Sequence, residues 1–340
     1  MKNIEVGNSG VQSTVMGLGC MGMSEFYGDQ DDVQSRATLE RAFELGVTHF
    51  DTANLYGRGH NERLVGEFAR GKRDTLMISS KFGIVRDPDG PLHSAYDRDI
   101  DNSPAYMRQC CDESLGRLGI DTIDIYYVHR ADPNVPIEET VGALAELKKE
   151  GKIRGIGLSE VDVDMLRRAH VEHPIAALQS EYSLWTREPE LNVLPVCKEL
   201  GITFFAYSPL GRGFLTGSLA KAADLDDDDF RLTSPRFQGG NFDTNLALVE
   251  EVRALGAKKG CAAGQIAIAW LYFRGQDIIP IPGTKRIKYL EENVGALDVE
   301  LSQDDLDRLE QILPIGGAAG DRYPAGFAGF KGDEDETEPS

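Results

Sequence analysis

The sequence predicts an α/β protein: a (β/α)8 TIM barrel preceded by an N-terminal β-hairpin and followed by a C-terminal extra helix and tail. Three observations lead to this prediction. Eight short apolar runs alternate with amphipathic stretches, which is the pattern of a parallel sheet with helical connections. A glycine follows most of the amphipathic stretches, as is common just after a helix ends. Chemically active polar residues stand directly after three successive apolar runs, where a barrel would gather them at one end.

The expected elements follow one another in a regular order along the chain. Residues 3–14 alternate around the sequence Gly-Asn-Ser-Gly, which is typical of a small hairpin. The expected strands are residues 15–18, 47–50, 76–79, 123–128, 153–158, 175–178, 202–206 and 278–281. The expected helices are residues 33–45, 60–70, 104–118, 137–149, 163–170, 190–200, 245–259, 286–294 and 302–312.

Two parts of the chain depart from this alternation. Residues 210–243 are long, Gly-rich and acidic, and we expect them to form a loop inserted after the seventh strand. Residues 316–340 end in a run of acidic residues and are typical of a C-terminal loop and a disordered acidic tail. Because single barrels commonly reach this length, residues 1–315 are expected to form one catalytic domain.

The composition limits the kinds of partner and compartment that we expect. The formal net charge of the 340 residues is −20, which argues against a nucleic acid or an anionic membrane as the partner. An anionic ligand would therefore need a local cluster of basic residues. The five cysteines show no CxxC spacing, and the chain has neither an apolar N-terminal segment nor an apolar run of membrane-spanning length. These features favour a cytoplasmic protein with reduced thiols.

Four chemically active side chains lie at the ends of three successive expected strands. Asp51 follows the second strand, Lys81 the third and His129 the fourth, and Tyr56 lies five residues beyond Asp51 in a glycine-containing loop. Each of them alone has an ordinary structural explanation, such as a helix cap or a packed ring. All four at matching strand ends favour an enzyme. The chain shows no cluster of His and carboxylate residues, so a metal site is not expected.

The segment from Gly17 to Gly22 matches the G-x-G-x-x-G pattern of dinucleotide-binding Rossmann folds. In such folds a helix begins within the glycines, whereas here a loop follows and the next helix is expected near Asp32. We therefore interpret these glycines as a strand end that lets a ligand approach the backbone closely.

Longer motifs extend over about residues 3–315. They are LGCMGMSEFYG (18–28), FDTANLYG (50–57), SKFG (80–83), ESLGRLGIDTIDIYYVH (113–129), IRGIGLSE (153–160), QSEYSLW (179–185), YSPLGRGFLTG (207–217) and IPGTKRIKYLEEN (281–293). With these motifs the sequence resembles the aldo-keto reductases, and it is most similar to the bacterial and plant branch with pyridoxal reductases and auxin-induced-type proteins. The resemblance implies a (β/α)8 barrel that reduces aldehydes and ketones to alcohols with NADPH.

The same resemblance implies that Asp51, Tyr56, Lys81 and His129 form a catalytic tetrad. Hydride addition to a carbonyl builds negative charge on its oxygen, so a proton donor must stand beside it, and this role falls to Tyr56. A neighbouring Lys81 ammonium would lower the pKa of the phenol, and Asp51 would keep Lys81 charged. His129 would donate to the carbonyl oxygen or orient it.

The resemblance also implies a site for NADP(H). Ser159 and Gln179 correspond to residues that contact the nicotinamide carboxamide, and Tyr207 to a residue that stacks on the ring. Lys285 and Arg286 open a helix and would hold the 2′-phosphate. The other implied cofactor contacts are Gly19, Cys20, Met21, Asp51, Ser208, Pro209, Leu210, Gly211, Arg212, Gly283, Thr284, Tyr289, Glu292 and Asn293. Glu160 departs from the better-known mammalian members, which carry Asn at this position.

The substrate pocket is expected to be lined by Phe26, Tyr27 and Trp185, with Tyr56 and His129 at its base. Core packing is an equally good explanation for each of the first three aromatic residues. The substrate would be a small aldehyde or ketone, and an oligomer is possible. An alternative function remains open, because regulatory subunits of the potassium-channel β type share this fold and tetrad.

Overall fold

The computed structural model describes residues 1–86, 99–219, 221, 225 and 229–324 of the chain. Eight parallel strands form the predicted barrel, and each strand pairs with its neighbour in the order of the chain. They are β3 (Gly17–Gly19), β4 (His49–Asp51), β5 (Met77–Phe82), β8 (Ile123–Val128), β9 (Ile153–Ser159), β10 (Ala177–Glu181), β11 (Thr203–Tyr207) and β12 (Ile278–Pro280). A parallel bridge between Gly19 and Gly283 joins the two edges, so the barrel is nearly closed.

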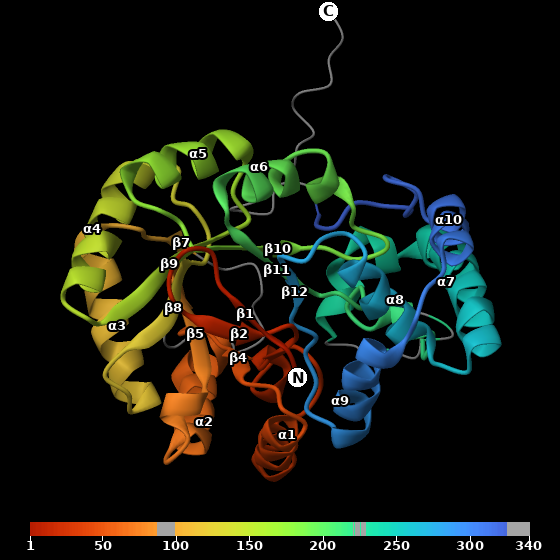
Figure 1. Ribbon diagram of the computed structural model, residues 1–340, viewed down its shortest axis with the longest axis horizontal. Helices are drawn as coiled ribbons and strands as arrows, with labels where there is room; N and C mark the ends of the chain where they lie inside the picture. The colour runs from red at the N-terminus through yellow and green to blue at the C-terminus, as the bar shows by residue number, and fades with distance from the viewer. Residues whose placement is uncertain (87–98, 220, 222–224, 226–228, 325–340) are drawn as a thin grey trace, which may run out of the picture.

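Helices surround the strands, and α7, α8 and α10 lie together on one side (Figure 1). The helices are α1 (Asp32–Glu44), α2 (His60–Ala69), α3 (Pro104–Leu118), α4 (Ile137–Lys149), α5 (Val163–Glu172), α6 (Val193–Leu200), α7 (Gly239–Lys259), α8 (Ala263–Tyr272), α9 (Ile287–Val294) and α10 (Gln303–Ile312). Within the described ranges, no helix is both long enough and apolar enough to cross a membrane.

The helix ends show the local chemistry that the sequence predicts. The Ser103 and Asp162 side chains accept hydrogen bonds from backbone amides in the first turns of α3 and α5, an arrangement that contributes roughly 1 kcal/mol to a helix. Gly119 and Gly201 follow α3 and α6 with φ values of 65° and 67°, in the left-handed region that glycine adopts without steric cost.

The predicted N-terminal hairpin is present and closes the bottom of the barrel. Strands β1 (Asn3–Glu5) and β2 (Gln12–Thr14) are antiparallel, and the buried residues Val6 and Val11 between them pack against the barrel interior. The Gly7 amide donates to the Thr203 hydroxyl oxygen at 2.8 Å, which fixes the hairpin to the beginning of β11. The open end of the barrel is therefore the end formed by the carboxyl termini of the strands.

The fold differs from the prediction at several element ends, where for example β3 is Gly17–Gly19 instead of residues 15–18, and in four larger features. Helix α8 was not predicted, because eight of its ten residues are buried and it lacks the amphipathic period of a surface helix. Strand β10 begins two residues later and ends three residues later than residues 175–178. Helix α7 begins at Gly239, so the predicted insertion at residues 210–243 is shorter than expected. A short ribbon of β6 (Ile84–Val85) and β7 (Asp99–Ile100) was also not predicted.

The predicted C-terminal loop and tail fall into two parts. Residues 316–324 belong to the described structure and contact the barrel. Residues 325–340, which carry the acidic run, lie outside the described residues.

The close packing of α2 on α3 depends on the absence of a side chain at Gly66. A Cβ atom at this position would lie 2.2 Å from the Leu118 carbonyl oxygen. We expect Gly66→Ala to lower the free energy of unfolding by roughly 1–3 kcal/mol, because the added methyl group forces the two helices apart. Urea unfolding followed by circular dichroism measures this change.

Gly116 in α3 provides a matched control, since a Cβ atom there would meet nothing within 4 Å. Gly116→Ala is expected to leave the protein as stable or to stabilise it by up to about 1 kcal/mol, because alanine is the better helix former. Equal destabilisation by the two variants would contradict the packing argument.

Candidate active site

A cavity of about 710 Å³ opens at the carboxyl ends of the barrel strands. The predicted site residues that line it are Gly19, Met21, Phe26, Tyr27, Asp51, Tyr56, His129, Ser159, Gln179, Tyr207, Ser208, Pro209, Leu210, Arg212, Gly283, Thr284, Lys285, Arg286, Tyr289, Glu292 and Asn293. Four others do not line it: Cys20, Lys81, Gly211 and Trp185. Lys81 lies directly behind the lining residues Asp51 and Tyr56, as described next.

The structure brings the four predicted tetrad residues together at the base of this cavity. Lys81 Nζ donates to Asp51 Oδ1, to the Thr52 carbonyl oxygen at 2.9 Å and to the Tyr56 hydroxyl oxygen at 3.3 Å. The rings of Tyr56 and His129 meet edge to face with their centroids 5.9 Å apart. All four side chains are buried, and Lys81 is completely inaccessible to solvent. A phenol and an imidazole therefore meet at the base of the cavity, with a buried ammonium directly behind the phenol.

The loop after β4 places Tyr56 by following the neighbouring strand. The Thr52 amide donates to the Ser79 carbonyl oxygen at 2.9 Å, and the Asn54 amide donates to the Lys81 carbonyl oxygen at 3.3 Å. Just beyond Tyr56, residues 57–59 have φ values of 55°, 53° and 82°, and this left-handed stretch turns the chain into α2. The tyrosine is thus fixed between a continued strand and a helix.

For both Tyr56 and Lys81, burial and the neighbouring charges shift the pKa in opposite directions. Burial raises the pKa of Tyr56 above its usual value, and the Lys81 ammonium counteracts part of this rise. Lys81 therefore acts in the direction predicted from the sequence, but burial outweighs it. Burial alone would lower the pKa of Lys81, whereas Asp51 and Tyr56 raise it above its usual value. Lys81 stays charged, and the phenol keeps its proton at neutral pH.

The residues expected at a nicotinamide ring lie next to the tetrad. Gln179 Nε2 donates to Asp51 Oδ2 at 2.9 Å, and the Ser159 hydroxyl oxygen accepts from the Arg130 guanidinium at 3.1 Å. Tyr207, the last residue of β11, lines the same part of the wall. These residues present an amide, a hydroxyl and an aromatic ring, which suit a planar carboxamide-bearing ligand.

The residues expected at a 2′-phosphate line the cavity where α9 begins. The Arg286 guanidinium lies over the Tyr289 ring, 5.9 Å from its centroid. Lys285 Nζ donates to the carbonyl oxygens of Tyr27 and Asp29, so it also ties the loop after β3 to the start of the helix. Burial, together with the charge of Arg286, lowers the pKa of Lys285.

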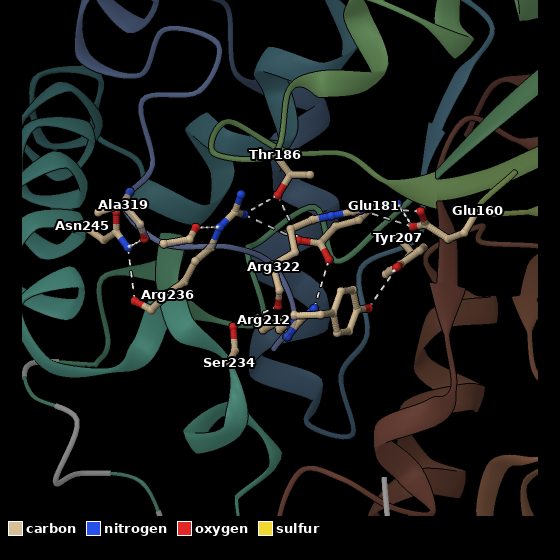
Figure 2. A network of polar contacts seen from close by, with 12 residues as sticks. Glu160, Glu181, Thr186, Tyr207, Arg212, Ser234, Arg236, Asn245, Ala319 and Arg322 are labelled. Atoms are coloured by element: carbon tan, nitrogen blue, oxygen red, sulfur yellow. Dashed lines mark hydrogen bonds and ion pairs between the residues drawn. The ribbon is translucent and has the colours of Figure 1, made fainter. Parts of the chain in front are cut away.

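Residues 316–324, which we call the C-terminal strap, run from α7 towards the cavity (Figure 2). The Asn245 side chain, only 1% exposed, donates to the Ala319 carbonyl oxygen at 2.9 Å and accepts from the Ala319 amide at 2.8 Å. Arg236 Nε donates to the Gly320 carbonyl oxygen at 3.1 Å. Because these bonds use main-chain atoms, they fix the path of the strap whatever side chains it carries.

The end of the strap places one side chain beside Glu160 and another beside the predicted cofactor residue Tyr207. The Ser234 hydroxyl donates to the Arg322 carbonyl oxygen at 3.1 Å, and the Arg322 guanidinium lies 3.3 and 3.4 Å from the two carboxylate oxygens of Glu160 (Figure 2). The hydroxyl groups of Tyr323 and Tyr207 are 3.3 Å apart. Glu160 is thus held by a cation that sequence reasoning did not identify.

Glu181 is a second buried carboxylate in this region. It accepts from Arg212 at 3.2 Å and from the Thr186 hydroxyl at 3.0 Å, and Arg236 lies 4.0 Å away. Burial raises the pKa of Glu181, but the surrounding guanidinium groups outweigh this and lower it below its usual value. Arg212 also lies over the Tyr323 ring, 4.7 Å from its centroid. Arg212, which the family resemblance implies as a cofactor contact, is therefore held between a carboxylate and the strap.

The three predicted substrate aromatics divide between two environments. Phe26 and Tyr27 line the cavity as expected. Trp185 is only 5% exposed and stacks on Phe214 with ring centroids 4.9 Å apart. A Cβ atom at Gly211 would lie 2.6 Å from its indole ring, so Trp185 supports the turn after β11 from below. Trp185 is thus not among the residues that line the cavity, and its packing agrees with the core-packing alternative.

Several residues that line the cavity were not predicted from the sequence. Arg130 directly follows His129, and its position after a strand end could have identified it. Arg231 lies over the Tyr27 ring from within the predicted insertion, and Tyr323 comes from the strap. Neither of the last two has a local sequence signal, because each reaches the cavity from a segment without regular periodicity.

Comparisons with known proteins agree on one family and one fold. The family model described as the aldo/keto reductase family matches residues 15–314. The chain is 42% identical to "Probable aldo-keto reductase 1" of Glycine max over 341 residues, covering 99% of this chain and 96% of the relative. A glycerol dehydrogenase of Gluconobacter oxydans superposes with a TM-score of 0.84 and 26% identity, covering 96% of this chain and 98% of that one. A holo-form aldo-keto reductase of Bacillus halodurans has the same fold, with a TM-score of 0.78 and 24% identity over 93% of this chain and 97% of that one.

The Asn245 contacts predict how the strap can be released. Asn245→Ala removes both hydrogen bonds to Ala319, and at about 0.5–1.5 kcal/mol each their loss should speed amide hydrogen exchange in residues 316–324 by roughly 5- to 100-fold. Hydrogen exchange read by mass spectrometry measures this change.

Thr244→Ala is the matched control. Among the described residues, the Thr244 hydroxyl bonds only within α7, to the Gly240 carbonyl oxygen, so exchange in the strap should stay at the wild-type rate. Unchanged exchange in the Asn245 variant would show that other contacts hold the strap.

Proposed function

The chain belongs to the aldo/keto reductase family, and from this premise we propose that it reduces aldehydes and ketones to alcohols by hydride transfer from NADPH, with Tyr56 as the proton donor. Family membership supports an oxidoreductase that acts on carbonyl groups. The observation that carries the finer proposal is the contact of Lys81 Nζ with Asp51 and with the Tyr56 hydroxyl at the base of the cavity. The proposal includes a small-molecule substrate and a cytoplasmic location.

The donor set of the cavity fits a phosphorylated dinucleotide. Side-chain hydroxyl and amide groups of Ser159 and Gln179 lie near the tetrad, and the cations Lys285 and Arg286 stand where α9 begins. Arg212 contributes a further guanidinium to the wall. Hydrogen-bonding groups therefore stand near the reacting centre and positive charges farther along the cavity, as NADPH requires.

When bound, NADPH supplies the hydride, and side chains of the protein donate the proton and stabilise the negative charge that develops. The Tyr56 hydroxyl donates its proton to the carbonyl oxygen as negative charge develops there. The Lys81 ammonium, 3.3 Å from the phenol oxygen, stabilises the phenolate that remains. Asp51 keeps Lys81 charged and in place, and His129, which lines the cavity beside Tyr56, orients the carbonyl oxygen.

The alternative of a cofactor-binding regulatory subunit is not favoured. The relatives named above are described as reductases and a dehydrogenase.

The role of Tyr56 predicts a selective loss of catalysis. Tyr56→Phe should lower kcat by roughly 10²- to 10⁴-fold, the usual contribution of a positioned general acid, while the Kd for NADPH changes little. Lys81→Met should cause a similar loss at neutral pH, because the charge that stabilises the phenolate is gone. NADPH oxidation with a panel of aliphatic and aromatic aldehydes measures kcat, and fluorescence titration measures Kd.

Tyr272→Phe is the control for loss of a tyrosine hydroxyl. This residue of α8 donates to the Val15 carbonyl oxygen at 3.2 Å, away from the cavity, so kcat should be unchanged. Full turnover by the Tyr56 variant would exclude Tyr56 as the proton donor.

The cations at the start of α9 predict the choice of nucleotide. NADPH differs from NADH by the 2′-phosphate, and a hydrogen bond to a charged group contributes roughly 1.5–3 kcal/mol. Replacing Lys285 and Arg286 together with Ala should weaken NADPH binding by about 10- to 100-fold or more, while NADH binding stays nearly constant. Calorimetric Kd values for both nucleotides measure the difference.

Lys149→Ala, which removes an exposed cation from α4, should change neither Kd. Parallel losses for the two nucleotides in the double variant would mean that another group holds the phosphate.

A further inference from the structure

Two groups outside the tetrad also hold the Asp51 carboxylate. Lys81 occupies Oδ1, and Oδ2 accepts from the Ser79 hydroxyl at 2.8 Å and from Gln179 Nε2 at 2.9 Å. Ser79 is completely buried on β5, two residues before Lys81, and it faces the barrel interior. Behind Ser79 lies His49 of β4, whose Nε2 is 3.0 Å from the Ser79 hydroxyl oxygen.

The direction of each hydrogen bond in this chain follows from the charge of Asp51. An ionised carboxylate can only accept, so Ser79 must donate its proton to Asp51. The Ser79 oxygen then accepts from His49, which places the imidazole proton on Nε2. His49 Nδ1 has no hydrogen-bond partner within the described structure and faces Gly17, where a Cβ atom would lie 2.4 Å away. Burial lowers the pKa of His49 to about 4, so the ring is neutral at pH 7.

We propose that Ser79 and His49 are positioning residues of the reductase, which hold Asp51 in the orientation that fixes Lys81 beside the Tyr56 hydroxyl. This inference rests on the proposed function of the tetrad. His49 is held in turn by an edge-to-face contact with Phe205, with ring centroids 4.9 Å apart. The polar chain thus runs from the barrel interior to the cavity wall, and each bond in it has one possible direction.

The charged groups around the tetrad determine in which direction the pKa of Tyr56 should shift when the Ser79 hydrogen bond is lost. The charged groups that act on Tyr56 are Lys81, Asp51 and Arg130. Burial raises the pKa of the nearby Cys20 thiol and the Tyr127 phenol, so both are uncharged at neutral pH. Removing the Ser79 hydrogen bond leaves the Asp51 charge less stabilised, and that charge opposes formation of the Tyr56 phenolate. The pKa of Tyr56 should therefore rise.

The test is the pH dependence of kcat in both reaction directions, for the wild type and for Ser79→Ala. We expect the titration of Tyr56 to move to higher pH by about 0.5 to 1 unit. Near neutral pH, kcat for alcohol oxidation, which requires the Tyr56 phenolate, should then fall about 3- to 10-fold, while kcat for carbonyl reduction, in which the protonated phenol is the donor, should fall less. The KM for the carbonyl substrate should change less than kcat. Ser79→Cys fills the same space with a weaker donor and should give a shift in the same direction but smaller, which also covers failure of the alanine variant to fold.

His49→Phe should shift the profile in the same direction as Ser79→Ala, but by less, because Ser79 can still reach Asp51. In a variant that already carries Ser79→Ala, adding His49→Phe should cause no further shift, since the link between the two residues is already broken. Additive shifts would contradict the proposed sequence of hydrogen bonds from His49 through Ser79 to Asp51.

Ser80→Ala is the matched control on the same strand. Ser80 is equally buried, but its hydroxyl donates to Glu62 of α2 at 2.6 Å, outside the barrel interior. This variant should lose stability and keep the wild-type pH profile. A wild-type profile for Ser79→Ala and Ser79→Cys, or an equal shift for Ser80→Ala, would overturn the inference while leaving Tyr56-dependent turnover intact. Turnover that does not depend on Tyr56 would instead overturn the proposed function and this inference with it.

Discussion

The buried ion pair between Lys81 and Asp51 is the interaction on which the rest of the site depends. Transfer of two charges from water into a protein interior costs several kcal/mol per ion, and their attraction offsets this only when further hydrogen bonds satisfy both groups. Thr52 supplies one such bond to the ammonium, and Ser79 and Gln179 supply two to the carboxylate. The pair is adjacent because β4 and β5 are neighbours in the barrel, with Asp51 opposite Ser79 in the register. Loss of either partner would leave an unpaired buried charge, at a cost of about 3–5 kcal/mol.

A polar chain inside a barrel needs space as well as hydrogen bonds, and glycines on neighbouring strands provide it. A Cβ atom at Gly17 of β3 would lie 2.4 Å from the His49 ring, and one at Gly157 of β9 would lie 2.3 Å from the Tyr127 ring. The alternation of glycine with branched apolar residues in β9 therefore allows large side chains from β8 to fill the centre. This arrangement matches the layered interior of barrels, where each layer draws on alternate strands. The small residues of one strand thus leave the space that the large side chains of the next strand fill.

The sequence predicts those parts of the fold and site that carry a local signal. Asp51, Lys81 and His129 follow apolar runs, so strand pattern and chemistry coincide, and the family resemblance extends the prediction to the proposed cofactor contacts that line the cavity. Helix α8 has no such signal, because it is apolar on nearly all sides and periodicity cannot separate it from a strand or a loop. The C-terminal strap at residues 316–324 has none either. Its partners stand 74 to 162 residues away in the chain, and its bonds to Asn245 and Arg236 use main-chain atoms that any sequence possesses.

The charge of the cavity is opposite to that of the protein, and this contrast bears directly on the proposed cofactor. With a net charge of −20, the chain as a whole repels anions. Among the described residues, the cavity wall carries two acidic side chains, Asp51 and Glu292, against six basic ones: Arg130, Arg212, Arg231, Lys285, Arg286 and Lys288. Glu160 and Glu181 lie close by, but guanidinium groups from the turn after β11, the segment before α7 and the strap pair with them. The strap thus supplies one of the cations that cancel the acidic groups beside Tyr207. A site that binds an anionic dinucleotide in so acidic a protein requires this local compensation, because charges are screened in solution but act strongly inside a partly enclosed, desolvated cavity.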